Sequence, residues 1–131
     1  MENINKMKKI INTKNAPQAI GPYNQAIQHG NTLYISGQIA IDPKNNTIKT
    51  ENIEDETHVV IKNIKNILKA ANMELSNIVK ISIFMKNMKD YQKINNVYSK
   101  YFINDFPARE AIEVSKLPKD VNIEISAIAI K

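Results

Sequence analysis

The sequence predicts an α+β domain in which two helices cover one face of a mixed β-sheet. Three observations lead to this fold class. Several segments alternate apolar and polar residues, as half-buried strands do. Two other segments repeat apolar residues every three or four positions, as amphipathic helices do. Their order is strands, helix, strand, helix and two strands, which suits a single domain over residues 1–131 with its helices on one side of the sheet.

The first part of the chain is expected to form strands separated by turns. One strand is expected around Lys9–Ile11, and an alternating segment over 23–29 follows the loop punctuated by Gly21-Pro22. Residues 32–41 (TLYISGQIAI) predict a further strand with four apolar residues on one face: Leu33, Ile35, Ile39 and Ile41. Gly37 interrupts this row, which indicates a bulge or the close approach of another group to the backbone.

The two helices follow from the spacing of apolar residues. After a turn at 42–46, the first helix is predicted from Ile53, Val60, Ile61, Ile64, Ile67, Leu68 and Ala71. Asn72 can take the left-handed conformation that ends a helix. A strand with Val79, Ile81, Ile83 and Met85 on one face comes next. The second helix is predicted from Tyr91, Ile94, Tyr98 and Tyr101, and Asp90 is expected to cap it.

Residues 106–130 predict two strands joined by a Leu-Pro-Lys-Asp turn. The first strand places Arg109, Ala111 and Glu113 on one face, and the second places Glu124 opposite a row of small and branched residues: Ile123, Ile125, Ala127 and Ala129. The stretch thus pairs a carboxylate-binding group with a candidate proton-transfer group. The rows opposite the core rows also hold apolar residues, namely Phe84, Ile128 and Ile130, which predicts a surface that meets a partner.

Arg109 and Glu124 are the side chains with the clearest chemistry. The guanidinium of Arg109 can grip a carboxylate with two parallel hydrogen bonds, although an arginine at a strand edge can equally form an ion pair with Glu110 or Glu124. Glu124 lies among apolar residues, where partial burial would raise its pKa toward a useful acid-base range. The alternative is an outward-facing glutamate without a chemical role.

Composition excludes several classes of function. The chain has no Cys, so disulfides, thiolate nucleophiles and thiolate metal sites are excluded, and His29 and His58 form no recognised ligand pair. We therefore expect neither a metal nor a cofactor. The net charge of +5 comes from dispersed lysines, which indicates a solvated surface more than a nucleic-acid partner. Apolar runs fall short of the roughly 18 residues of a membrane span, so a cytoplasmic protein is expected, with an organellar address left open by the basic start.

Four stretches of the chain resemble one known family. NAPQAIGPYNQA, ISGQ, PAR and LPKDVNIEISAIA are similar to the signature of the reactive intermediate deaminase family, called RidA, YjgF or L-PSP endoribonuclease. The resemblance implies a chorismate mutase-like sandwich with a six-stranded sheet. It also implies a homotrimer with sites in the clefts between subunits, which binds a small imino or 2-oxo acid. The implied reaction is cofactor-free hydrolysis of enamine and imine intermediates, such as 2-aminoacrylate and 2-iminobutanoate, to 2-oxo acids and ammonia.

The resemblance also assigns roles to individual residues. Arg109 would bind the substrate carboxylate and Glu124 would orient or activate water, in a pocket lined by Tyr23, Ser36, Gly37 and Asn95. From the residues alone, structural roles remain open for the last four.

The sequence departs from the family pattern at one position: Ala111 stands where some members carry a cysteine, so thiol chemistry cannot be essential. Two rival functions remain open. One is the ribonuclease or translation inhibitor of the older family names, and the other is a non-catalytic sensor that binds a small ligand in the same pocket.

Overall fold

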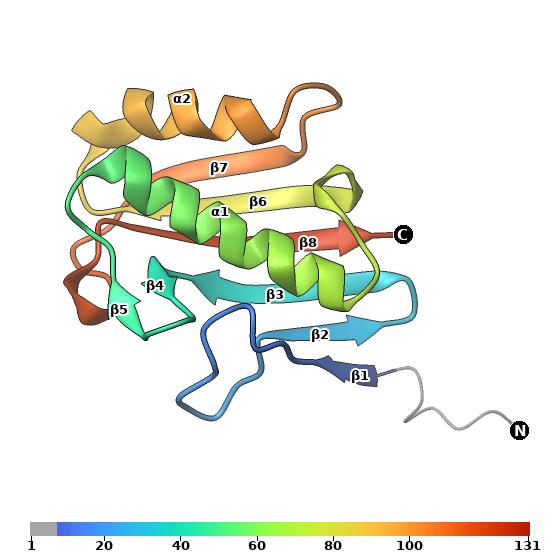
Figure 1. The fold of residues 1–131 in the computed structure, drawn as a ribbon. Coiled ribbons are helices and arrows are strands. Elements are labelled where there is room, and N and C mark those ends of the chain that lie inside the picture. Colours follow the sequence, from blue (N-terminus) through green and yellow to red (C-terminus); the bar gives the residue numbers. More distant parts are fainter. Residues whose placement is uncertain (1–7) are drawn as a thin grey trace, which may run out of the picture.

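The computed structural model describes residues 8–131 and shows a six-stranded mixed sheet with two helices on one face (Figure 1). Its elements are β1 (Lys8–Ile11), β2 (Ala26–His29), β3 (Thr32–Gln38), β4 (Ile41–Asp42), β5 (Thr47–Ile48), α1 (Ile53–Ala70), β6 (Ile78–Met85), α2 (Tyr91–Tyr101), β7 (Ala108–Glu113) and β8 (Ile123–Ile130). The sheet order is β1-β2-β3-β8-β6-β7, and β4 and β5 form a separate two-stranded hairpin. Only the β6–β7 pair of this sheet is parallel. The predicted α+β class is confirmed.

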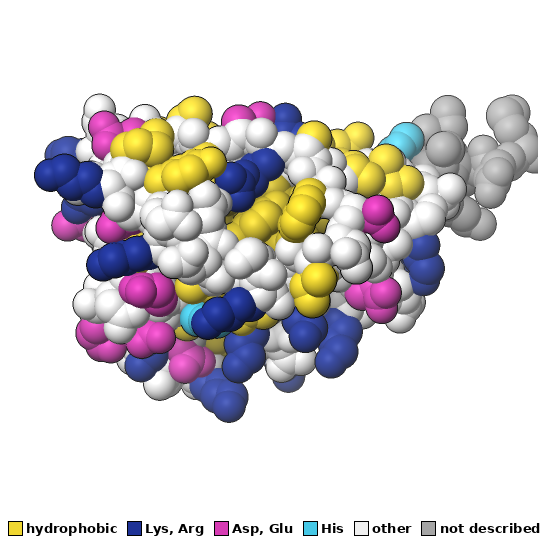
Figure 2. Space-filling view, turned by 90° about the horizontal axis from the view of Figure 1, so that it is seen from above, with side chains coloured by type: hydrophobic (Ala, Val, Ile, Leu, Met, Phe, Trp, Pro, Cys, Tyr) yellow, Lys and Arg dark blue, Asp and Glu magenta, His cyan; other side chains and the backbone are white. Residues whose placement is uncertain are grey.

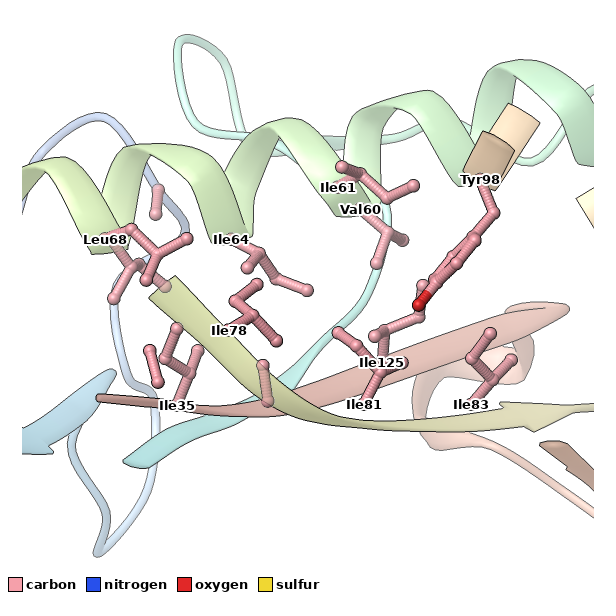
Figure 3. Packing of buried hydrophobic residues seen from close by; sticks show 14 of the residues in the cluster. Ile35, Val60, Ile61, Ile64, Leu68, Ile78, Ile81, Ile83, Tyr98 and Ile125 are labelled. Atoms are coloured by element: carbon pink, nitrogen blue, oxygen red, sulfur yellow. The ribbon is translucent and has the colours of Figure 1, made fainter. Parts of the chain in front are cut away.

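The core lies between α1 and the middle of the sheet. Helix α1 packs over β3 and β8 and against α2. Figure 3 shows side chains from α1 meeting side chains that rise from the strands: Val60, Ile61, Ile64 and Leu68 on the helix, and Ile35, Ile78, Ile81, Ile83 and Ile125 on the sheet. All of them are buried. This packing places the predicted apolar rows of α1 and β8 in the core.

Identifiable residues start and end α1. The side chain of Asn52 accepts a hydrogen bond from the backbone N–H of Asp55 (2.8 Å) and so caps the first turn. After the helix, Asn72 adopts a φ of 58°, the left-handed conformation that the sequence predicts.

The start of α2 differs from the prediction. Asp90 makes no capping hydrogen bond, so the prediction that it caps this helix is wrong. The entry to α2 is a short 3₁₀ turn over Met88–Asp90, which Asn87 starts by accepting from the N–H of Lys89 (2.9 Å).

Two strands break the simple alternation that the sequence predicts. In β3 the pairing with β8 shifts between Ile35 and Gln38, so Gln38 takes the buried position opposite Ile125. Ile39 and Ile41 are therefore not the continuation of the buried row, because the bulge moves the pattern by one residue. In β6 a similar shift between Ile78 and Lys80 buries Ile78 and leaves Val79 exposed, contrary to the prediction. A bulge shifts the alternation of buried and exposed residues, so the pattern on one side of it does not predict the pattern on the other.

The face of the sheet opposite the helices carries the apolar side chains that the sequence predicts there. Tyr34, Ile112 and Ile130 are about half exposed, with Phe84 and Ile128 partly buried beside them. In Figure 2, which looks down on the β7 edge, apolar side chains gather on the side away from α1, whereas charged side chains dominate the helix side. We call this surface the open face. In residues 8–131, neither helix has both the length and the apolar character needed to cross a membrane.

Candidate active site

The predicted site residues fall into two groups in the structure. One group surrounds Arg109 on β7 and α2, and we call it the Arg109 cluster: Tyr91, Asn95, Tyr98 and Arg109. The other lines a pocket around Glu124, and we call it the Glu124 pocket: Tyr23, Ser36, Gly37 and Glu124, with the apolar and turn residues beside them.

In the Arg109 cluster, side chains of one helix face hold the guanidinium. Tyr91, Asn95 and Tyr98 recur at steps of four and three residues, so they lie on the same side of α2. Arg109 donates from Nη1 to Oδ1 of Asn95 (2.9 Å) and from Nη2 to the hydroxyl oxygen of Tyr91 (3.0 Å). Its guanidinium carbon lies 4.8 Å from the centroid of the Tyr98 ring. These bonds use two of the five N–H groups of the guanidinium, which leaves donors for a ligand. Neither ion pair considered for Arg109 forms: Lys80 pairs with Glu110 instead, at 2.7 Å.

The same contacts change the acidity of two tyrosines. A hydrogen bond from Asn95 and the positive charge of Arg109 lower the pKa of the Tyr91 hydroxyl. Burial raises the pKa of Tyr98, and Arg109 opposes that shift. The Tyr98 hydroxyl is buried without a hydrogen-bond partner in the part of the chain that the structure describes. The Arg109 cluster therefore presents a positively charged surface with free hydrogen-bond donors.

The Glu124 pocket is a cavity of about 750 Å³ with mixed walls. Apolar walls come from Pro17, Ile20, Ile39, Ile41, Ile48 and Pro118, and the polar lining residues are Gln18, Tyr23, Gln25, Ser36, Gln38, Asn46, Lys119 and Glu124. Burial raises the pKa of Glu124, in agreement with the expectation from its apolar neighbours. The pocket thus presents a carboxylate whose raised pKa favours a role in proton transfer.

Gly37 is needed here for space. A β-carbon at this position would lie 2.4 Å from Oε2 and 2.8 Å from Cδ of Glu124, so the carboxylate occupies the volume that any other residue would fill. The bulge and the close approach predicted at Gly37 are both present.

Ser36 and Tyr23 are connected through the loop before β2. The Ser36 hydroxyl donates to the backbone oxygen of Asn24 (2.6 Å), and the Ser36 N–H donates to the oxygen of Gln25 (2.9 Å). The hydroxyl hydrogen of Ser36 is therefore used within the chain, and the side chain fixes the segment next to Tyr23. Tyr23 itself lies in this loop and is about half exposed, because β2 begins only at Ala26.

A single chain does not bring Arg109 and Glu124 together. Across β6, Ile83 pairs with both Ala111 and Ile125, which face the helices, whereas Phe84 pairs with both Ile112 and Glu124 on the open face. Arg109 is two residues before Ala111 and shares its face. The two groups thus lie on opposite faces of the sheet and on strands separated by β6, so one subunit alone does not bring the two side chains into one site.

Sequence reasoning did not assign Tyr91 and Tyr98 to the site. Their spacing around Asn95 on one helix face, opposite a strand arginine, was the signal that could have identified them. Within residues 8–131, no group of three or more His, Asp or Glu side chains could hold a metal ion.

Comparisons with known proteins agree on one family. The family described as "Endoribonuclease L-PSP" matches residues 13–131. A RutC family protein of Pyrococcus horikoshii is 54% identical over 125 residues, which cover 95% of this chain and 99% of that protein. A 2-iminobutanoate/2-iminopropanoate deaminase of Dermatophagoides farinae is 42% identical, over 94% of this chain and 96% of the relative. The solved structure of E. coli TdcF with bound serine has a TM-score of 0.90 and 37% identity, and covers 94% of this chain and 98% of its own.

Proposed function

Because the chain belongs to the L-PSP endoribonuclease (RidA/YjgF) family, we propose that it hydrolyses small 2-imino acids to 2-oxo acids and ammonia. The substrates would be 2-iminobutanoate and 2-iminopropanoate, the latter formed from 2-aminoacrylate, and no cofactor would be required. The observation that carries this proposal is Glu124, a carboxylate with a raised pKa that lies over Gly37 at a pocket wall. Arg109, held by Asn95 and Tyr91, complements it as a carboxylate-binding group.

The proposed enzyme is a homotrimer in which neighbouring subunits complete each site. Two features support this assembly. The Arg109 cluster and the Glu124 pocket lie on opposite faces of one sheet, so only a second copy can combine them. The open face also exposes apolar side chains, including Tyr34, Ile112 and Ile130, that a partner would cover. In this arrangement the Arg109 cluster of one subunit faces the Glu124 pocket of the next.

A hydrolytic mechanism follows from these groups. Arg109 holds the substrate carboxylate and fixes the position of C2. A water molecule then adds its oxygen to C2 of the protonated imine, while one of its protons passes to Glu124. Glu124 returns that proton to the nitrogen of the aminol. The C–N bond breaks with its electron pair on the departing ammonia, and the hydroxyl group becomes the carbonyl of the 2-oxo acid as its proton passes to the Glu124 carboxylate and from there to solvent. The negative charge of Glu124 also stabilises the positive charge of the protonated imine.

A coupled trapping assay tests the proposal. Threonine dehydratase generates the imine, semicarbazide traps the imine that persists, and the protein competes with the trap. We expect the wild type to reduce the trapped product and Glu124→Gln to lose about 10²–10⁴-fold of this activity. Light scattering would check that both proteins form the same oligomer. Unchanged trapped product with wild type would refute the deaminase, and binding of 2-oxobutanoate without turnover would favour the ligand sensor.

A further inference from the structure

Tyr91 lies beside the carboxylate-binding arginine with a hydroxyl hydrogen that the protein does not use. Tyr91 begins α2 and is 37% exposed. Its oxygen accepts a hydrogen bond from Nη2 of Arg109 at 3.0 Å. A guanidinium has donors and no acceptor, so the tyrosine must be the acceptor in this pair. Within residues 8–131, no hydrogen bond donated by the Tyr91 hydroxyl is present, and its hydrogen is available to a ligand.

We propose that the Tyr91 hydroxyl donates a hydrogen bond to the ligand carboxylate that Arg109 holds, and so increases the preference of the site for acids over neutral analogues. This inference rests on the proposed function for the identity of the ligand. A carboxylate offers about four lone-pair positions, so it can accept from the guanidinium and from the neighbouring hydroxyl together. Bonds to an ionised acceptor are roughly twice as strong as bonds between neutral groups. A carboxamide has one accepting oxygen, and its NH₂ group cannot accept from Tyr91.

The other tyrosines of α2 do not offer the same donor. The Tyr98 oxygen is buried, the residue is only 6% exposed, and the guanidinium lies over its ring. The Tyr101 hydroxyl is bonded to Nδ1 of His58 (2.7 Å). Tyr91 therefore differs from both by combining exposure, contact with Arg109 and an unused hydrogen. Asn95 accepts from the other side of the guanidinium, so Arg109 keeps an anchor when the Tyr91 hydroxyl is removed.

The test compares two ligands on three proteins. Calorimetry would measure binding of 2-oxobutanoate and of its neutral amide, 2-oxobutanamide, to wild type, Tyr91→Phe and Tyr101→Phe. Tyr91→Phe keeps the aromatic ring and removes only the hydroxyl. We expect this variant to bind the acid on the order of tenfold to a hundredfold more weakly and the amide almost unchanged. Tyr101→Phe is the matched control, and it should bind both ligands like wild type.

If Tyr91 had a purely structural role, Tyr91→Phe would weaken the binding of both ligands equally, and that result would overturn the inference. Unchanged binding of the acid to Tyr91→Phe would overturn it as well. In the trapping assay, Tyr91→Phe should have a higher KM with little change in kcat, because the hydrogen bond from the Tyr91 hydroxyl to the carboxylate forms equally in the bound substrate and in the transition state. Tyr91→Leu, which also lacks a donor, replaces the phenylalanine variant if that protein does not fold. A wild type that binds the acid through Tyr91 but hydrolyses no imine would refute the proposed function alone. A wild type that does not bind the acid would overturn the inference as well.

Discussion

Replacing Gly37 with alanine would put a methyl group where the carboxylate of Glu124 now lies. The new β-carbon would be 2.4 Å from Oε2, whereas ordinary contacts begin near 3.4 Å, so the carboxylate must move by about 1 Å. The clashing atoms belong to the end of a flexible side chain, and φ of Gly37 is outside the left-handed region, so the fold should survive. A displacement of this size can cost about 10²-fold in rate. We expect Gly37→Ala to fold normally and to lose about that much imine hydrolysis.

Gly30→Ala is the matched control for this prediction. Gly30 has a φ of 58°, and a β-carbon added there would have no heavy atom within 4 Å, so alanine strains the backbone without touching the pocket. Thermal melting and the trapping assay would be run on both variants. Gly30→Ala should lower stability by about 1 kcal/mol and keep full activity. Full activity in folded Gly37→Ala would show that the position of the Glu124 carboxylate does not matter to the reaction, and would refute the reasoning.

Three further changes test other parts of the structure. Arg109→Lys should keep the oligomer but lose about 100-fold of the activity in the trapping assay, because a point charge replaces the fork that Asn95 and the ligand share; near-normal turnover would refute the carboxylate clamp. The pKa of Glu124 is raised in the folded state, so ionisation of this partly buried group destabilises the fold as pH rises through that pKa. Glu124→Gln should therefore melt higher than wild type at neutral pH, and the difference should vanish as pH falls below the ordinary glutamate value of about 4.3; a difference that does not depend on pH would contradict the burial. Glu56 is completely buried and its carboxylate accepts from the backbone N–H groups of Asn122 and Ile123 (2.7 and 3.2 Å) and from the side-chain amide of Asn122 (2.7 Å). Glu56→Ala removes the partner of all three donors; counting only the two backbone N–H groups, at about 1–3 kcal/mol each, urea unfolding should show a loss of about 2–6 kcal/mol, and a loss below about 1 kcal/mol would exclude this role.

The sequence predicted the elements whose pattern is local and unbroken. Helix α1 and the buried row of β8 follow from periodicity, the stop at Asn72 follows from the left-handed conformation that asparagine tolerates, and the close approach at Gly37 follows from a glycine inside a strand. The pattern failed where a bulge shifts it by one residue, as at Val79, because a bulge depends on the partner strand. The spatial relation between Arg109 and Glu124 within one subunit could not be predicted from the sequence for a similar reason. Alternation says which residues of one strand share a face, but only the pairing of β7 and β8 with β6 decides whether rows from two strands share one.

Tyr91 shows a different limit of sequence reasoning. Its place in a 3–4 repeat predicts an apolar helix residue, and this prediction accounts for its ring but not for its hydroxyl. The hydroxyl meets Arg109 because β7 lies beside the strand that precedes α2, a parallel pairing that no short-range pattern reports.

The separation of the Arg109 cluster and the Glu124 pocket on opposite faces of one sheet has a genetic consequence. In the proposed ring of three subunits, each cleft takes its arginine from one copy and its glutamate from the next. A mixed ring built from Arg109 and Glu124 variants always contains one cleft that receives both unaltered residues. Two inactive alleles, one of each kind, should therefore complement each other in the same cell, although each alone yields inactive protein. Two alleles altered in the same group, such as Arg109 and Asn95, should not.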